Sequence, residues 1–255
     1  MVPMRTFEIA GRTVSRVGLG TNRLTDTDQN REFLRSAVDA GLGFIDTAHL
    51  YTDGASEATV GAALAPFPED VVVATKGGYR SNEADGLRSE IEGSLDRLRT
   101  DRIDLWYLHR IKDDAPFERT LGVISEFVDA GRIAHVGLSE VGVDEIERAR
   151  SELPVVAVQN EYGLAERKHD EVIDYCETHG IVFVPFFPLA GEDTDELGRV
   201  AAAHDATLNQ IRLAWLLHRS PVVAPIPGTL SPDHLRENLA ATEIDLSVEE
   251  IEAIG

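Results

Sequence analysis

The feature that most constrains the fold is a strand-then-helix alternation that occurs eight times along the 255-residue chain. Short, unbroken apolar runs alternate with longer amphipathic stretches, and the loops between them are short. Strands without polar alternation belong to parallel sheets that are buried on both faces. Eight such units in about 250 residues predict an α/β fold, a (β/α)8 TIM barrel. An open doubly wound sheet is the alternative, but the chain lacks a Gly-rich nucleotide fingerprint.

The element boundaries follow from apolar periodicity and from glycines that end helices. An N-terminal β-hairpin is expected over residues 5–9 and 13–17, with glycine at its turn. Strands are expected at 17–21, 44–46, 71–75, 103–108, 133–138, 155–158, 181–184 and 222–224. Helices are expected at 28–40, 56–64, 87–99, 117–130, 143–151, 168–179, 193–204, 207–219 and 231–241. No break in composition divides the chain, so residues 1–255 are predicted to form a single domain.

The chain is strongly acidic, with 45 Asp and Glu against 24 Lys and Arg and a net charge of -21. The acids are dispersed, a pattern typical of halophilic proteins, whose acidic surface repulsion is screened by salt. An ordinary acidic cytosolic protein is the alternative. Either way the charge argues against nucleic-acid binding, which requires clustered cations.

The chain has no features of a secreted or membrane protein. Cys176 is the single cysteine and cannot form an internal disulfide. No apolar signal segment precedes the first strand, and no apolar run approaches the roughly 20 residues that span a bilayer. We expect a soluble cytoplasmic protein without a membrane partner, a monomer or a weak homo-oligomer.

Polar residues stand where five consecutive strands end. In a barrel these ends meet on one face, which is where active sites of this architecture lie. The sequence therefore predicts one functional site there, formed by Asp46, Lys76, His109, Ser139, and Gln159 with Asn160.

Tyr51 follows Asp46 by five residues and adds a phenol to this site. A phenol is a poor acid at neutral pH, but a nearby ammonium stabilises the phenolate. A buried Lys76 needs a partner, which Asp46 would supply, and a neutral His109 could orient a carbonyl. The set has no activated nucleophile and no metal-ligand spacing. It suits carbonyl polarisation while another group delivers hydride.

Several segments occur in a fixed order: Phe44-Ile45-Asp46-Thr47-Ala48-x-x-Tyr51, Gly54-x-Ser56-Glu57, Ala74-Thr75-Lys76, Asp104-Leu105-x-x-Leu108-His109, Gly131-x-Ile133-x-x-Val136-Gly137-Leu138-Ser139, Val158-Gln159-Asn160-x-Tyr162, and Ile226-Pro227-Gly228-Thr229. With these segments the chain resembles the aldo-keto reductase superfamily over essentially its whole length. The resemblance implies an oxidoreductase that reduces small aldehydes or ketones. It makes Tyr51 the general acid/base, tuned by Lys76 and Asp46, with His109 assisting.

The resemblance also implies a nicotinamide cofactor held without a Rossmann domain. NADP(H) is favoured, and NAD(H) stays open because Ser231 and His234 stand where many relatives clamp a 2′-phosphate with Lys or Arg. The position after Ser139 is usually Asn but here is Glu140. The cofactor contacts so implied are Thr21, Asp46, Ser139, Glu140, Gln159, Phe186, Leu189, Ile226, Gly228, Thr229, Ser231, His234, Glu237 and Asn238.

A narrower likeness is to the bacterial pyridoxal reductase group. It rests on the segments Leu108–Ile111, Gly137–Val141, Phe183–Leu189 and Arg219–Thr229. It implies that Glu140 is a trait of the subgroup and that pyridoxal-like aldehydes are candidate substrates.

Two other functions fit part of the pattern. A non-catalytic, cofactor-sensing subunit of the same fold would keep both Tyr51 and Lys76. A Schiff-base aldolase could use Lys76 as its nucleophile, because burial can tune a lysine for that chemistry.

Overall fold

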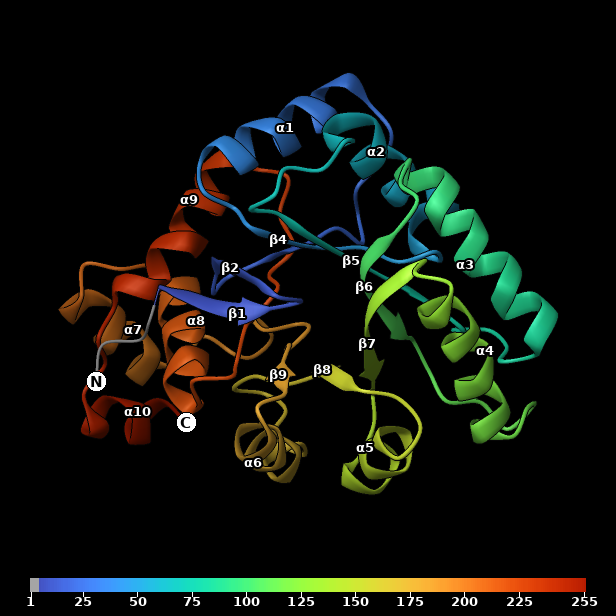
Figure 1. Ribbon diagram of the computed structural model, residues 1–255. Helices are drawn as coiled ribbons and strands as arrows, with labels where there is room; N and C mark the ends of the chain where they lie inside the picture. The colour runs from blue at the N-terminus through green and yellow to red at the C-terminus, as the bar shows by residue number, and fades with distance from the viewer. Residues whose placement is uncertain (1–4) are drawn as a thin grey trace.

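The computed structural model describes residues 5–255 of the chain. Its centre is a parallel sheet of seven strands that lie side by side in sequence order (Figure 1). The strands are β3 (Leu19–Gly20), β4 (Phe44–Asp46), β5 (Val72–Gly77), β6 (Ile103–Leu108), β7 (Ile133–Ser139), β8 (Val155–Gln159) and β9 (Val182–Phe183).

The sheet closes through residues 222–228, which form an extended segment between β9 and β3. Pro225 and Pro227 have no N–H, so toward β3 they can only accept hydrogen bonds. Their carbonyls accept from the backbone N–H groups of Gly18 and Gly20 at 2.9 and 3.2 Å. The regular eighth strand that the sequence predicts is therefore absent, yet these isolated bridges close the barrel.

Helices follow the strands around the outside of the barrel (Figure 1). They are α1 (Asp28–Asp39), α2 (Ala55–Leu64), α3 (Ala84–Leu98), α4 (Phe117–Asp129), α5 (Val143–Arg150), α6 (Asp170–His179), α7 (Asp195–Ala203), α8 (Leu208–Arg219), α9 (Pro232–Ala240) and α10 (Val248–Ile254), with 3-10 turns η1 (Tyr51–Gly54) and η2 (Ala241–Glu243). The last helix was not expected. It begins with a capping box in which Ser247 and Glu250 satisfy each other's backbone N–H groups.

The predicted hairpin is present as β1 (Thr6–Ile9) and β2 (Arg12–Ser15). Ala10 and Gly11 at its turn have φ angles of 50° and 71°, and paired positive φ values match the twist of a hairpin. Its apolar side covers one end of the barrel, where Phe7 packs edge-on against Phe44 with ring centroids 6.3 Å apart.

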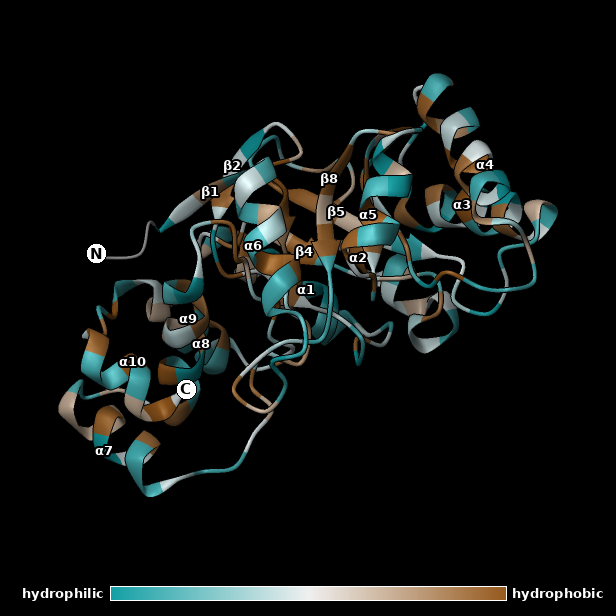
Figure 2. Ribbon diagram, turned by 90° about the horizontal axis from the view of Figure 1, so that it is seen from below, coloured by the Kyte–Doolittle hydropathy of each residue, from teal (hydrophilic) through white to brown (hydrophobic). Residues whose placement is uncertain are grey.

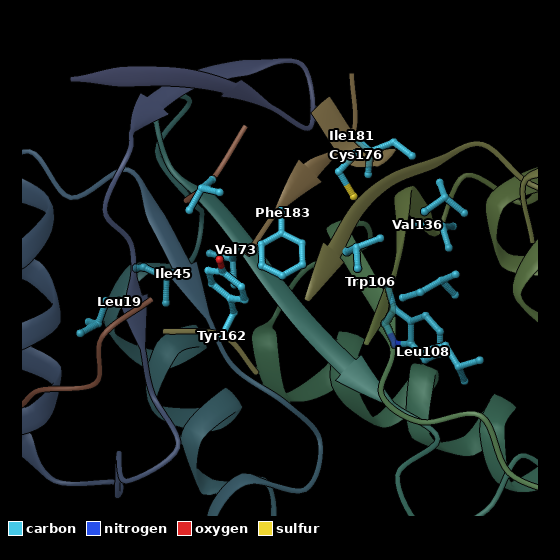
Figure 3. Packing of buried hydrophobic residues seen from close by; sticks show 14 of the residues in the cluster. Leu19, Ile45, Val73, Trp106, Leu108, Val136, Tyr162, Cys176, Ile181 and Phe183 are labelled. Atoms are coloured by element: carbon cyan, nitrogen blue, oxygen red, sulfur yellow. The ribbon is translucent and has the colours of Figure 1, made fainter. Parts of the chain in front are cut away.

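The strands separate two apolar cores because successive side chains point to opposite faces. On β6, Leu105 and Tyr107 face the barrel interior, whereas Trp106 and Leu108 face the helices. Figure 2 shows the apolar strands at the centre and helices that are polar on their outer sides. Part of the outer core is drawn in Figure 3. Between Arg5 and Gly255, no helix combines the length and apolar composition that crossing a bilayer requires.

Candidate active site

A buried ion pair lies at the carboxyl ends of β4 and β5. Lys76 Nζ is 2.5 Å from Asp46 Oδ1 and also donates to the Thr47 carbonyl at 2.8 Å. Lys76 is fully buried and Asp46 is 1% exposed. Burial lowers the pKa of Lys76, but Asp46 and then Tyr51 raise it by more, so the net direction is upward. The structure thus keeps Lys76 as an ammonium ion.

The third partner of that ammonium is Tyr51, whose hydroxyl lies 3.2 Å from Lys76 Nζ. Tyr51 opens η1, and the residues after it have an unusual backbone. Thr52, Asp53 and Gly54 have φ angles of 49°, 53° and 87°. Such left-handed residues are costly unless glycine, and they concentrate at functional sites.

Polar contacts beneath η1 hold this backbone in place. Glu57 is fully buried and accepts hydrogen bonds from the Thr75 hydroxyl and, at 2.7 Å, from Arg97 Nε. Arg97 Nη2 also lies 2.7 Å from His49 Nδ1. A Cβ at Gly54 would meet Arg97 Cδ at 2.9 Å, so the arginine packs directly under the turn. Glu57 and Arg97 therefore support the turn that follows Tyr51.

His109 follows β6 and is 6% exposed. Burial, followed by the charges of Lys76, Arg110 and Lys112, lowers the pKa of His109 to about 2. The imidazole is therefore neutral at any working pH. Its Nδ1 atom has no hydrogen-bond partner among residues 5–255, and its ring stands edge to face with Tyr51 at 6.1 Å. The Nδ1 atom is buried, but the residue borders a cavity, so a ligand there can meet another part of the neutral imidazole.

Two adjoining cavities open at this face of the barrel. The larger has a volume of about 530 Å³ and is bordered by Asp46, Tyr51, His109, Ser139, Gln159, Phe186, Leu189 and Ile226. The smaller, of about 330 Å³, is bordered by Thr229, Leu230, Ser231 and His234. Gly20, Thr21, Asn22, Arg23 and Gly228 border both cavities. The two cavities form one cleft in two parts, which suits a ligand with two ends, such as a dinucleotide.

Comparisons with known proteins identify the family. A match to the aldo/keto reductase family covers residues 16–255. The chain belongs to the aldo/keto reductase family. Pyridoxine 4-dehydrogenase of Escherichia coli is 35% identical over 271 residues, covering 96% of this chain and 95% of that protein.

Solved structures of this family superimpose closely on the chain. A thermostable aldo-keto reductase in complex with the inhibitor epalrestat has a TM-score of 0.91 at 34% identity, over 98% of both chains. An aldo/keto reductase of Klebsiella pneumoniae in complex with NADP and acetate has a TM-score of 0.86 at 29% identity, over 99% of this chain and 94% of that one. These matches confirm the predicted superfamily and the (β/α)8 barrel, and make the chain an oxidoreductase.

Not every cofactor contact expected from this aldo/keto reductase sequence borders the cleft. Glu140 turns its carboxylate away, accepting from the Glu161 backbone N–H at 2.6 Å with Lys168 Nζ at 3.7 Å. Glu237 and Asn238 lie farther along α9 and border neither cavity. Gln159 borders the larger cavity but donates from Nε2 to Asp46 Oδ2 at 2.8 Å.

The cleft also contains residues that the sequence reasoning missed. Arg110, Tyr79 and Phe187 border the larger cavity, and Arg23 stands where the two cavities join. The signal was present for both arginines, because Arg110 directly follows His109 and Arg23 comes two residues after Thr21. Both arginines lie in loops that follow strands, as Tyr51 and His109 do.

Proposed function

We propose that the chain is an NADP(H)-dependent reductase of small aldehydes and ketones in which Tyr51 is the general acid. The observation that carries this proposal is the linked set of Asp46, Lys76 and Tyr51, with the tyrosine bordering a cavity. A phenol next to a buried ammonium is arranged to release a proton and to be stabilised afterwards as a phenolate.

Each of these residues has its own role in carbonyl reduction. When bound, the cofactor supplies a hydride. Hydride addition places negative charge on the carbonyl oxygen, and Tyr51 donates its proton to that oxygen. Lys76 then neutralises the phenolate, while Asp46 holds Lys76 in place. Neutral His109 orients the carbonyl from the same cavity.

The cleft fits the proposed cofactor. Thr21, Ser139 and Gln159 border the larger cavity together with Phe186, whose ring can offer a flat apolar surface to a nicotinamide. The smaller cavity lies at the start of α9, where Ser231 accepts from the backbone N–H of His234 at 3.4 Å. Helix starts bind phosphate groups well. The NADP complex of the Klebsiella pneumoniae relative favours NADP(H) over NAD(H).

The Schiff-base aldolase fits less well. That chemistry needs a neutral amine as its nucleophile. Lys76 is instead kept charged, because Asp46 and Tyr51 raise its pKa above the ordinary value by more than burial lowers it. No observation in residues 5–255 specifically favours a cofactor-sensing subunit.

The finer properties are part of the same proposal. Likeness to pyridoxine 4-dehydrogenase suggests pyridoxal among the substrates. Cys176 is buried and free, so the described fold needs no oxidising compartment, which fits a cytoplasmic enzyme. We expect a monomer or a weak homo-oligomer.

An activity assay tests the proposal. It uses the purified protein in molar salt, with NADPH or NADH and a panel of aldehydes that includes pyridoxal. Loss of the reduced cofactor's absorbance upon aldehyde addition is the expected result. Stoichiometric cofactor binding without any turnover would favour the sensing subunit. Borohydride trapping of a substrate on Lys76 would favour the aldolase.

A further inference from the structure

Arg110 is a cation inside the cleft of a very acidic protein. It is half-buried and borders the same cavity as Tyr51 and His109. No carboxylate among residues 5–255 forms an ion pair with Arg110. Many other arginines do pair, as Arg97 does with Glu57 at 2.7 Å. In a chain with 45 acidic residues, a cavity-lining arginine without a carboxylate partner calls for a functional explanation.

The guanidinium of Arg110 is held in place by contacts that occupy only some of its hydrogen-bond donors. Its Nη1 atom donates to the His109 carbonyl at 2.6 Å and to the Ser139 hydroxyl at 3.0 Å. Nε and Nη2 have no hydrogen-bond partner in the described chain. The group lies 5.5 Å from the centre of the Tyr79 ring and 5.9 Å from that of Phe186. Aromatic contacts hold a planar guanidinium while leaving its remaining N–H donors free.

The surroundings of Arg110 make this side of the cavity electropositive. Lys112 Nζ also lies 5.5 Å from the centre of the Tyr79 ring, so two cations contact one aromatic side chain. Both cations also contribute to the low pKa of His109. Positive charge in a partly dry cavity attracts an anion more strongly than the same charge in water.

We propose that Arg110 binds an anionic oxygen on the substrate and makes the enzyme selective for aldehydes that carry a carboxylate or a phenolate. This inference rests on the proposed carbonyl reductase function. A guanidinium presents donors in a fork that matches paired oxygens, so a carboxylate can be held by two bonds. Tyr51 and His109 border the same cavity, so one molecule can reach all three groups.

Matched substrates test the selectivity directly. We expect 4-carboxybenzaldehyde to have a kcat/KM at least tenfold above that of its neutral methyl ester, and salicylaldehyde above its phenolate pKa to exceed benzaldehyde. Arg110→Gln should reduce both preferences at least tenfold, measured as the ratio of kcat/KM for the anionic and the neutral aldehyde in the same variant. Arg110→Lys should keep part of the preference, because the charge remains. Added salt should weaken the preference of the wild type for anionic aldehydes.

Arg80→Gln is the matched control. Arg80 is exposed and borders a neighbouring cavity of about 170 Å³, which shares Tyr79 and His109 with the larger cavity; Arg80 itself does not border the larger cavity. Its loss removes one positive charge near the cleft without removing a donor from the larger cavity, so the preference should persist.

The outcomes separate the inference from the function it rests on. Equal kcat/KM for neutral and anionic aldehydes, or an unchanged preference in Arg110→Gln, would overturn the inference and leave the reductase intact. Weaker NADPH binding in Arg110→Gln by fluorescence titration, with selectivity unchanged, would assign Arg110 to the cofactor instead. Absence of turnover with every aldehyde would overturn both proposals.

Discussion

Tyr51 is the residue on which the proposed chemistry depends, since its hydroxyl contacts the buried ammonium of Lys76 and the residue borders the cavity. Tyr51→Phe removes that proton but keeps the ring. We expect kcat to fall by at least about 10²-fold, the effect of a positioned general acid. NADPH affinity, measured by fluorescence titration, should stay unchanged. Wild-type turnover in this variant would refute the mechanism.

The ion pair of Asp46 and Lys76 is expected to matter for stability as well as for chemistry. Asp46→Asn leaves a buried ammonium without its counter-charge, which costs about 3–5 kcal/mol of unfolding free energy. The double variant with Lys76→Met should recover part of that loss, and urea denaturation measures both. Glu126→Gln, which breaks an exposed pair with Arg88, is the control and should change little. A double variant less stable than Asp46→Asn would contradict the expectation.

His109 should make the fold sensitive to acid. The pKa of His109 is about 2 in the folded chain, against an ordinary value of 6.5. Between these two pH values the unfolded state binds a proton on His109 and the folded state does not. Its contribution to stability is complete above pH 6.5 and is lost as pH falls toward 2. The unfolding free energy should therefore fall less steeply between pH 7 and pH 4.5 in His109→Gln than in the wild type. The difference between the two slopes should be up to about 1.4 kcal/mol per pH unit. Parallel curves would argue against a neutral, buried imidazole.

At the scale of elements, the closure of the barrel depends on a close approach between β3 and the segment at 222–228. A Cβ at Gly20 would lie 2.8 Å from the Ile226 carbonyl oxygen, a backbone atom that cannot move alone. Gly20→Ala should lower the unfolding free energy by about 1–3 kcal/mol, as other overpacked sites do. It should also weaken NADPH binding, because Gly20 borders both cavities.

Gly122→Ala is the matched control for this change. Gly122 lies within α4, and a Cβ there would meet nothing within 4 Å. The substitution should raise the unfolding free energy by about 0.5–1 kcal/mol, because alanine loses less backbone freedom in a helix. If Gly20→Ala were equally harmless, the crowded closure would be disproved.

For the whole molecule, the net charge of -21 sets the response to salt. Screening of repulsion among dispersed carboxylates should stabilise the folded state as NaCl rises to molar levels. A gain of about 2 kcal/mol would raise Tm by about 4–8 °C in a chain of this size. Scanning calorimetry with sucrose at matched osmolality distinguishes screening from solute exclusion. A Tm that is flat or falls with NaCl would count against salt adaptation.

Much of the fold could be predicted because it depends on local pattern. Uninterrupted apolar runs such as 71–74 have to be buried on both faces, and glycines such as Gly131 and Gly180 end helices by adopting positive φ. The eighth strand was mispredicted because periodicity takes no account of hydrogen bonding. Pro225 and Pro227 removed the donors that a regular ladder requires.

The sequence by itself determined the (β/α)8 barrel and the polar residues at its strand ends, because hydrophobic periodicity and residue order are local properties. The tertiary structure decided the outward turn of the Glu140 carboxylate, the support of the turn after Tyr51 by Glu57 and Arg97, and the two free donors of Arg110. Those features depend on the direction of side chains in space and on partners far away in the chain. Arg97 and Glu57 are forty residues apart, and only folding brings them within 2.7 Å.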